Sequence, residues 1–260
     1  MLIFFKSLNP IYQTLIATSI TYLFTVLGSA LVFCFKKVNK NFMDAILGMA
    51  GGVMLSAVFF SLINPALEFA SDLKQSASLV LSIGIMLGGL LLFITDKISD
   101  KVLSKYENKS SKKRIFMLLF SITIHNIPEG LVVGLAFGNI IYGGSTVDSA
   151  IMLALGIAIQ NFPEGSALSI PMKREGISTF KSFFLGQISG IVEPIAGIIG
   201  VILSLKIKTI MPLMLSFAGG AMIYVVVEEI IPESQTNKKK SLMALFTLIG
   251  FILMMILDIM

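Results

Sequence analysis

Two copies of one short motif place polar residues inside apolar stretches of this chain. The copies run from Ile124 to Gly130 and from Ile159 to Gly165, and five of their seven positions are identical. A carboxylate near the centre of a bilayer costs roughly 2.5 kcal/mol or more on insertion scales. Glutamates repeated in such a setting therefore predict a functional site.

Helical spacing predicts which of these side chains meet. Residues three or four positions apart lie on the same helix face, so each copy turns two polar side chains and one glutamate in one direction. A third apolar stretch adds a glutamate that is followed by Pro194. The residues expected to converge are His125, Asn126, Glu129, Gln160, Asn161, Glu164 and Glu193.

Carboxylate, imidazole and amide oxygen groups are ligands for divalent transition metals. Pro128 and Pro163 should each kink a helix beside the cluster and expose backbone carbonyl oxygens, which can also bind a cation. The alternative is that the polar groups only hydrogen-bond between helices and hold a bundle together. Three unpaired carboxylates would repel one another, which favours the metal site.

Composition shows where these motifs must lie. The chain has 260 residues, of which 55% are hydrophobic and only 13% are charged. An ordinary soluble domain carries about 25% charged residues, so a soluble globular protein is excluded. Eight stretches are long enough to span a bilayer: about Ile11 to Phe35, Phe42 to Ile63, Ala77 to Thr95, Ile115 to Phe137, Ala150 to Met172, Ser182 to Leu205, Ile210 to Ile231 and Ser241 to Met260. We therefore expect an all-α polytopic membrane protein with eight transmembrane helices in one domain, residues 1–260.

Basic residues predict the orientation. If the chain crosses the membrane eight times, sixteen of the twenty Lys and Arg residues fall on one side and four on the other. The positive-inside rule then places the sixteen in the cytoplasm and both termini outside. The longest connection, the lysine-rich loop from about Asp96 to Arg114, is expected to be cytoplasmic and to set this topology, rather than to bind a lipid or protein partner.

A second similarity suggests an inverted repeat. Ala50-Gly51-Gly52-Val53-Met54 in the second span recurs as Ala218-Gly219-Gly220-Ala221-Met222 in the seventh, which runs in the opposite direction. Inverted repeats are typical of transporters, although so short a match could also be a shared packing motif. Glycines four residues apart, such as Gly130 and Gly134, predict close helix packing.

The two Asn-x-Pro-Glu-Gly motifs together with Glu193-Pro194 resemble the signature of the ZIP family of zinc- and iron-regulated transporter-like proteins, in its prokaryotic branch. The resemblance extends over essentially the whole chain. It implies helices 1–3 and 6–8 arranged around helices 4 and 5, termini outside the cell membrane, uptake of divalent metals into the cytoplasm, and a homodimer.

The resemblance also implies a binuclear metal site. One ion would be held by His125, Glu129, Glu164 and Glu193, and the other by Asn126, Glu129, Gln160, Asn161, Glu164 and Glu193. Many relatives have His at the position of Gln160 and others Asp at that of Asn161, so selectivity among Zn²⁺, Fe²⁺, Mn²⁺ and Cd²⁺ stays open.

Acidic residues outside the cluster have weaker interpretations. Glu228 and Glu229, near the cytoplasmic end of the seventh span, are either ligands on an exit path or carboxylates that reach headgroup water. Glu68 and Asp72 are expected in the outer loop after the second span, where ordinary solvation is the simpler interpretation.

Two other functions share some of these features. A metal-selective channel would use the same ligands, and sequence does not separate it from a carrier that works by alternating access. An intramembrane metal hydrolase would typically need a His-Glu-x-x-His motif, which a chain with one histidine does not have. We therefore expect no enzyme, no cofactor and no nucleic-acid partner. The expected partners are lipid and the transported metal.

Overall fold

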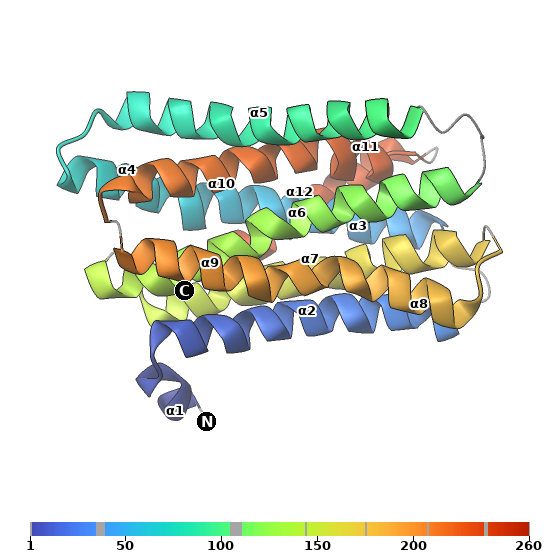
Figure 1. Cartoon of the computed structure of the whole chain (residues 1–260), viewed down its shortest axis with the longest axis horizontal. Coiled ribbons are helices and arrows are strands. Elements are labelled where there is room, and N and C mark those ends of the chain that lie inside the picture. The colour runs from blue at the N-terminus through green and yellow to red at the C-terminus, as the bar shows by residue number, and fades with distance from the viewer. Residues whose placement is uncertain are drawn as a thin grey trace.

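The structure is a computed structural model that describes residues 2–34, 40–104, 111–143, 145–174, 176–206, 208–236 and 239–259. Some side chains within these ranges, that of His125 among them, lie outside the described part. The described residues form helices joined by short turns, with no β-strand among them. Figure 1 shows the long helices lying side by side, with the N- and C-terminal ends toward the same end of the helices.

The first half of the chain contains the helices α1 (Leu2–Ser7), α2 (Pro10–Cys34), α3 (Lys40–Ala57), α4 (Asn64–Asp72), α5 (Ala77–Ser104) and α6 (Ser111–Asn139). The second half contains α7 (Val147–Arg174), α8 (Thr179–Ile188), α9 (Val192–Lys206), α10 (Met211–Val225), α11 (Ile231–Ser234) and α12 (Lys240–Ile259). Three-residue 3₁₀ turns are η2 (Ile140–Tyr142), η3 (Ser189–Ile191) and η4 (Lys208–Ile210), and π-helical segments are η1 (Val58–Ile63) and η5 (Val226–Ile230).

The prediction of an all-helical polytopic membrane protein is confirmed. Seven segments of the described chain are long and apolar enough to cross a bilayer. The 28-residue α7, which carries the second polar motif, is not among the seven. The predicted count of eight spans therefore stays a prediction, because it requires that the polar helix α7 also crosses the membrane.

Four pairs of helices pack closely because glycines, which have no side chain, lie where their backbones meet. A Cβ atom added at Gly28 of α2 would lie 1.8 Å from the carbonyl oxygen of Phe162 in α7. One added at Gly134 of α6 would lie 2.0 Å from that of Gly197 in α9. The pairs α5 with α10 and α3 with α12 approach one another equally closely through other glycines. The predicted role of spaced glycines in helix packing is thus confirmed.

These pairs group into two bundles, which Figure 1 shows one above the other. We call α2, α6, α7, α8, η3 and α9 the polar bundle, and α3, η1, α4, α5, α10, η5, α11 and α12 the apolar bundle. Contacts between the bundles are made mainly by α3 on α7 and by α10 on α6. Among the described residues, 18 of the 22 buried polar or charged side chains belong to the polar bundle.

The two copies of the repeated motif have similar surroundings in the apolar bundle, and the inverted repeat itself stays a prediction. A Cβ atom added at Gly88 would lie 1.9 Å from the carbonyl oxygen of Phe217, and one added at Gly250 would lie 2.0 Å from that of Met49. Met49 and Phe217 directly precede the two copies of the repeated motif. Each copy also leads into a π-helical segment, η1 or η5, in helices that Figure 1 shows running in opposite directions.

The predicted lysine-rich loop is largely helical, which corrects the sequence interpretation. Helix α5 continues to Ser104 and α6 begins at Ser111, so only residues 105–110 of the predicted loop lie outside the described chain. Charged residues do not end a helix once it leaves the bilayer, because its backbone hydrogen bonds are internal. Lys97 also covers apolar surface, since its Nζ atom lies 5.6 Å from the centre of the Phe93 ring.

Two further expectations need correction. Glu68 and Asp72 lie in the helix α4 and not in a loop, because Pro65 occupies the first turn of that helix, where a missing amide proton is tolerated. The predicted sixth span is not one regular helix, because the 3₁₀ turn η3 separates α8 from α9 immediately before Val192 and Glu193.

Candidate metal site

The converging residues of the prediction come together inside the polar bundle. Helix α6 supplies Asn126 and Glu129, α7 supplies Gln160, Asn161 and Glu164, and α9 supplies Glu193. All six side chains are buried, and the most accessible, that of Glu164, is only 6% exposed. The predicted ligand His125 lies on α6, but its side chain is outside the described residues.

Two amides of α7 bridge to glutamates on the neighbouring helices. The Nε2 atom of Gln160 donates a hydrogen bond of 2.6 Å to Oε1 of Glu129 on α6. The Nδ2 atom of Asn161 donates one of 2.9 Å to Oε2 of Glu193 on α9. Each amide therefore directs its nitrogen to a carboxylate, which leaves its oxygen for another partner.

Several oxygens of the cluster have no hydrogen-bond partner among the described residues. They are Oε2 of Glu129, Oε1 of Gln160, Oδ1 of Asn161, Oε1 of Glu193 and Oδ1 of Asn126. A buried acceptor without a partner costs about 1–3 kcal/mol, so such groups need an explanation when they gather in one place. Acceptor oxygens from three helices fit the coordination of a hard or borderline divalent cation.

The carboxylates of the cluster are close enough to influence one another. Electrostatic repulsion acts between Glu129 and both Glu164 and Glu193, and also between Glu164 and Glu193. Buried like charges are unfavourable unless a cation or a proton compensates them. The electrostatics of the cluster therefore favour a divalent cation as its ligand.

Local irregularities of the backbone position the cluster. Helices α6 and α7 continue through Pro128 and Pro163, each of which removes one amide donor from the helix interior. The turn η3 precedes Glu193, and a Cβ atom at Gly190 would lie 3.0 Å from both Oε1 of Glu193 and Oγ1 of Thr25. Glycine at that position thus lets α2 approach the glutamate closely.

Among the described residues, no three His, Cys, Asp or Glu side chains are arranged to hold one metal ion by themselves. Two of the three carboxylates are instead turned toward amides of α7. Amide oxygens must therefore contribute if a metal binds here. The division of the residues into two metal positions stays a prediction.

Sequence reasoning missed the contribution of α2. Thr14, Thr18, Thr21, Thr25 and Ser29 are all buried, with exposures of at most 1%, along one face of that helix. The spacing of four, three, four and four residues was a helical signal that could have been recognised in the sequence. At Thr21 this hydroxyl stripe reaches the cluster, where the hydroxyl donates a hydrogen bond to Oε2 of Glu193.

The predicted exit residues lie in the other bundle. Glu228 and Glu229 are both on η5, where Glu228 is exposed and Glu229 is half-buried. Their charges and that of Asp96 on α5 act on the Tyr224 side chain. They form a separate acidic region, and their role on an exit path stays a prediction.

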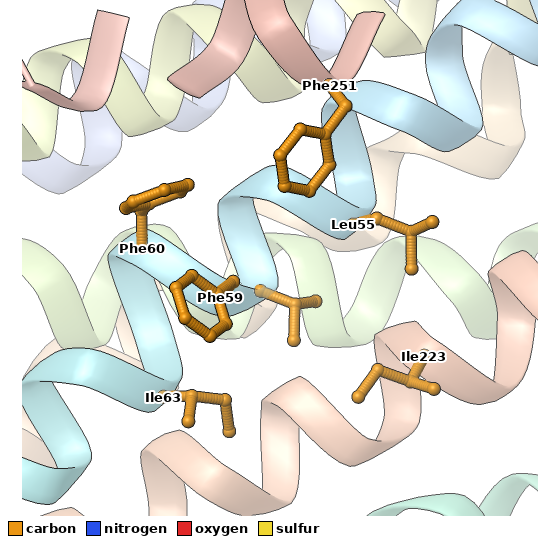
Figure 2. A pocket seen from close by; sticks show the side chains of 7 residues that line it. Leu55, Phe59, Phe60, Ile63, Ile223 and Phe251 are labelled. Carbon is orange, nitrogen blue, oxygen red and sulfur yellow. The ribbon is translucent and has the colours of Figure 1, made fainter. Parts of the chain in front are cut away.

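The apolar bundle has a pocket of about 380 Å³ beside η1. Figure 2 shows that its wall is made of aliphatic and aromatic side chains. The lining residues are Leu55, Val58, Phe59, Phe60, Ile63, Ile223 and Phe251. None of these side chains can bind a cation through oxygen or nitrogen, so this pocket is not the metal site.

Comparison with known proteins shows which family the chain resembles. Residues 11–115 and 104–258 match the family described as ZIP Zinc transporter. The chain is 36% identical to the zinc transporter ZIP11 of Xenopus tropicalis, over 96% of this chain and 98% of that protein. It is 31% identical to the zinc transporter GufA of Myxococcus xanthus, over 94% and 97% of the two chains. It is 32% identical to the zinc transporter ZIPB of Bordetella bronchiseptica, over 90% and 76%.

Proposed function

The chain belongs to the ZIP family of zinc transporters, and from this premise we propose that it carries divalent metal ions into the cytoplasm through the cluster on α6, α7 and α9. It is a multi-pass membrane transporter and not an enzyme. Zinc is the proposed substrate because the relatives are named zinc transporters, with Fe²⁺, Mn²⁺ and Cd²⁺ as further candidates.

One observation supports the proposed site above the others. Buried acceptor oxygens on three helices lack a hydrogen-bond partner among the described residues, although the Gln160 and Asn161 amides of the same cluster donate to Glu129 and Glu193. A metal ion would satisfy these oxygens and compensate the carboxylates. We propose His125, Asn126, Glu129, Gln160, Asn161, Glu164 and Glu193 as its ligands.

The transport mechanism that we propose is alternating access. Helices α6 and α7 hold most of the ligands, and both pack tightly on α9 or α2 within the polar bundle. The contacts between the bundles are fewer than those within them, and at Gly156 they involve the flexible side chain of Met254. We therefore propose that the polar bundle moves as a unit against the apolar bundle, with α2 and α9 accompanying α6 and α7.

The metal site is tested by uptake of Zn²⁺ into proteoliposomes. Alanine at Glu129 should abolish uptake, while Glu68→Ala, which changes an exposed carboxylate of α4, should leave it unchanged. Normal flux in the Glu129 variant would contradict the site. Flux that saturates with Zn²⁺ concentration and depends steeply on temperature supports a carrier, whereas non-saturating flux would indicate a channel.

We further propose that both termini lie outside a cell membrane and that the single domain of residues 1–260 works as a homodimer. The excess of basic residues on one side supports this orientation. In a Cys34→Ser background, Ser145→Cys should react with an impermeant thiol reagent added outside, and Ser110→Cys should not. The opposite labelling would reverse the proposed direction of transport.

A further inference from the structure

The hydroxyl stripe of α2 reaches the cluster at Glu193, and we infer that Thr21 is a positioning residue that orients the Glu193 carboxylate for metal binding. This inference rests on the proposed function. The Thr21 side chain is fully buried and belongs to a helix that carries none of the predicted ligands.

Two donors from two helices hold the same oxygen of Glu193. The hydroxyl of Thr21 donates to Oε2 from α2, and Nδ2 of Asn161 donates to Oε2 from α7 over 2.9 Å. Asn161 also donates to the backbone carbonyl oxygen of Thr21, over 3.4 Å. Thr21, Asn161 and Glu193 therefore form a closed set of contacts between three helices.

This arrangement separates the two oxygens of Glu193. Oε2 is occupied by both donors, whereas Oε1 receives neither of them and lies near Gly190, as does the hydroxyl of Thr25. A carboxylate that is fixed through one oxygen presents the other in a defined direction. Partners that orient a metal ligand without touching the metal typically change metal affinity by 10- to 100-fold when they are removed.

The hydroxyl of Thr21 has a second acceptor, the carbonyl oxygen of Thr18, at 2.9 Å. A threonine hydroxyl has one proton to donate, and a bond to a carboxylate is the stronger of the two. Thr18, one turn earlier on the same face, offers the contrast. Among the described residues, its hydroxyl donates to backbone carbonyl oxygens, those of Thr14 at 2.8 Å and Leu15 at 3.4 Å.

The experiment measures equilibrium Zn²⁺ binding to the purified full chain in detergent and Zn²⁺ uptake in proteoliposomes. Thr21→Val keeps the shape of the side chain and removes the hydroxyl, so the dissociation constant should rise roughly tenfold. Thr21→Ser keeps the hydroxyl and should stay within about twofold of the unchanged protein. Thr18→Val is the matched control and should bind Zn²⁺ like the unchanged protein.

A double variant of Thr21 and Glu193 distinguishes a positioning role of Thr21 from a role in packing. In a Glu193→Gln background, Thr21→Val should cause no further loss of affinity, because the carboxylate that Thr21 orients is gone. Thr21→Ala is the second hydroxyl-free variant and takes the place of Thr21→Val if the latter does not fold. Unchanged affinity in the hydroxyl-free variant, no rescue by serine, or a full additional loss in the Glu193→Gln background would each overturn the inference.

Failure of this inference is distinguishable from failure of the proposed site. If Glu129→Ala abolishes uptake and the hydroxyl-free Thr21 variant binds Zn²⁺ normally, the site stands and the role of Thr21 does not. If Glu129→Ala transports normally, the proposed site itself is wrong.

Discussion

Both bundles pack through glycines, but the interior of one is polar and that of the other is apolar. In the polar bundle Gly28 and Gly134 bring backbones into contact, and in the apolar bundle Gly52 and Gly88 do so, with added Cβ atoms 1.8 to 2.0 Å from a carbonyl oxygen. Yet of the buried polar side chains among the described residues, 18 lie in the polar bundle and four in the apolar one.

The difference between the bundles distinguishes the residues that pack helices together from the residues proposed to bind metal. Close glycine packing holds helices together in lipid with few polar contacts in the apolar bundle, where Ser61 of η1 donates a hydrogen bond of 2.6 Å to Asp258 of α12. The buried carboxylates and amides of the polar bundle are therefore not needed for helix association as such. Their cost in the membrane is explained if they bind the transported ion.

The largest expected effect compares one carboxylate from each bundle. Glu164→Ala should lower Zn²⁺ uptake by at least about 100-fold, because it removes a charge and a proposed ligand from a buried site. Glu228→Ala, which changes an exposed carboxylate of η5, should lower uptake only a few-fold even if the residue lies on the exit path. Uptake in proteoliposomes with matched protein content measures both. Equal losses in the two variants would remove the functional distinction between the bundles.

Close glycine packing can be tested by comparing two adjacent glycines, Gly88 and Gly89. Gly88→Ala should destabilise the protein by about 1–3 kcal/mol, because the new methyl group would collide with the Phe217 carbonyl oxygen. Gly89→Ala is the matched control, since its methyl group would be 3.7 Å from the nearest atom, the carbonyl oxygen of Gly220. Thermal unfolding in detergent measures both, and a Gly89 variant as unstable as the Gly88 variant would argue against backbone contact as the cause.

His125 is the only histidine of the chain, and its removal tests which metal the polar bundle prefers. His125→Ala should weaken Zn²⁺ binding about tenfold and Mn²⁺ binding less, because imidazole favours zinc and carboxylates favour manganese. Competition between the two ions for the purified protein measures the change in their ranking. Equal weakening for both ions would mean that His125 does not discriminate between them.

A smaller effect is expected from protons, which compete with metal for the same oxygens. As pH falls from about 7 to 5, protons should occupy the carboxylates and His125, so Zn²⁺ affinity should fall by at least about threefold per pH unit. Glu193→Gln should flatten this dependence by removing one titrating group. Equilibrium binding at several pH values measures it, and an affinity independent of pH over this range would disprove the linkage while leaving the site in place.

Much of the site could be predicted from the sequence because it depends on local spacing. The four-residue separation of His125 and Glu129 defines a helix face wherever that helix lies, and an apolar stretch of more than 20 residues defines a span. The grouping of α6, α7 and α9 was predicted because each carries a glutamate inside an apolar stretch. Basic residues did not mark helix ends, because α5 and α6 extend into the region where a loop was expected.

By itself, the sequence determined that this chain is an all-helical membrane protein with carboxylates and amides on a few internal helix faces. Only the tertiary structure decided which helices share a bundle, and that the hydroxyl of Thr21, 172 positions from Glu193 in the chain, touches that carboxylate. It also decided that η3 interrupts the sixth span just before Glu193. The physical reason is that periodicity specifies a direction around one helix axis, whereas a contact between helices depends on how closely glycines allow their backbones to approach.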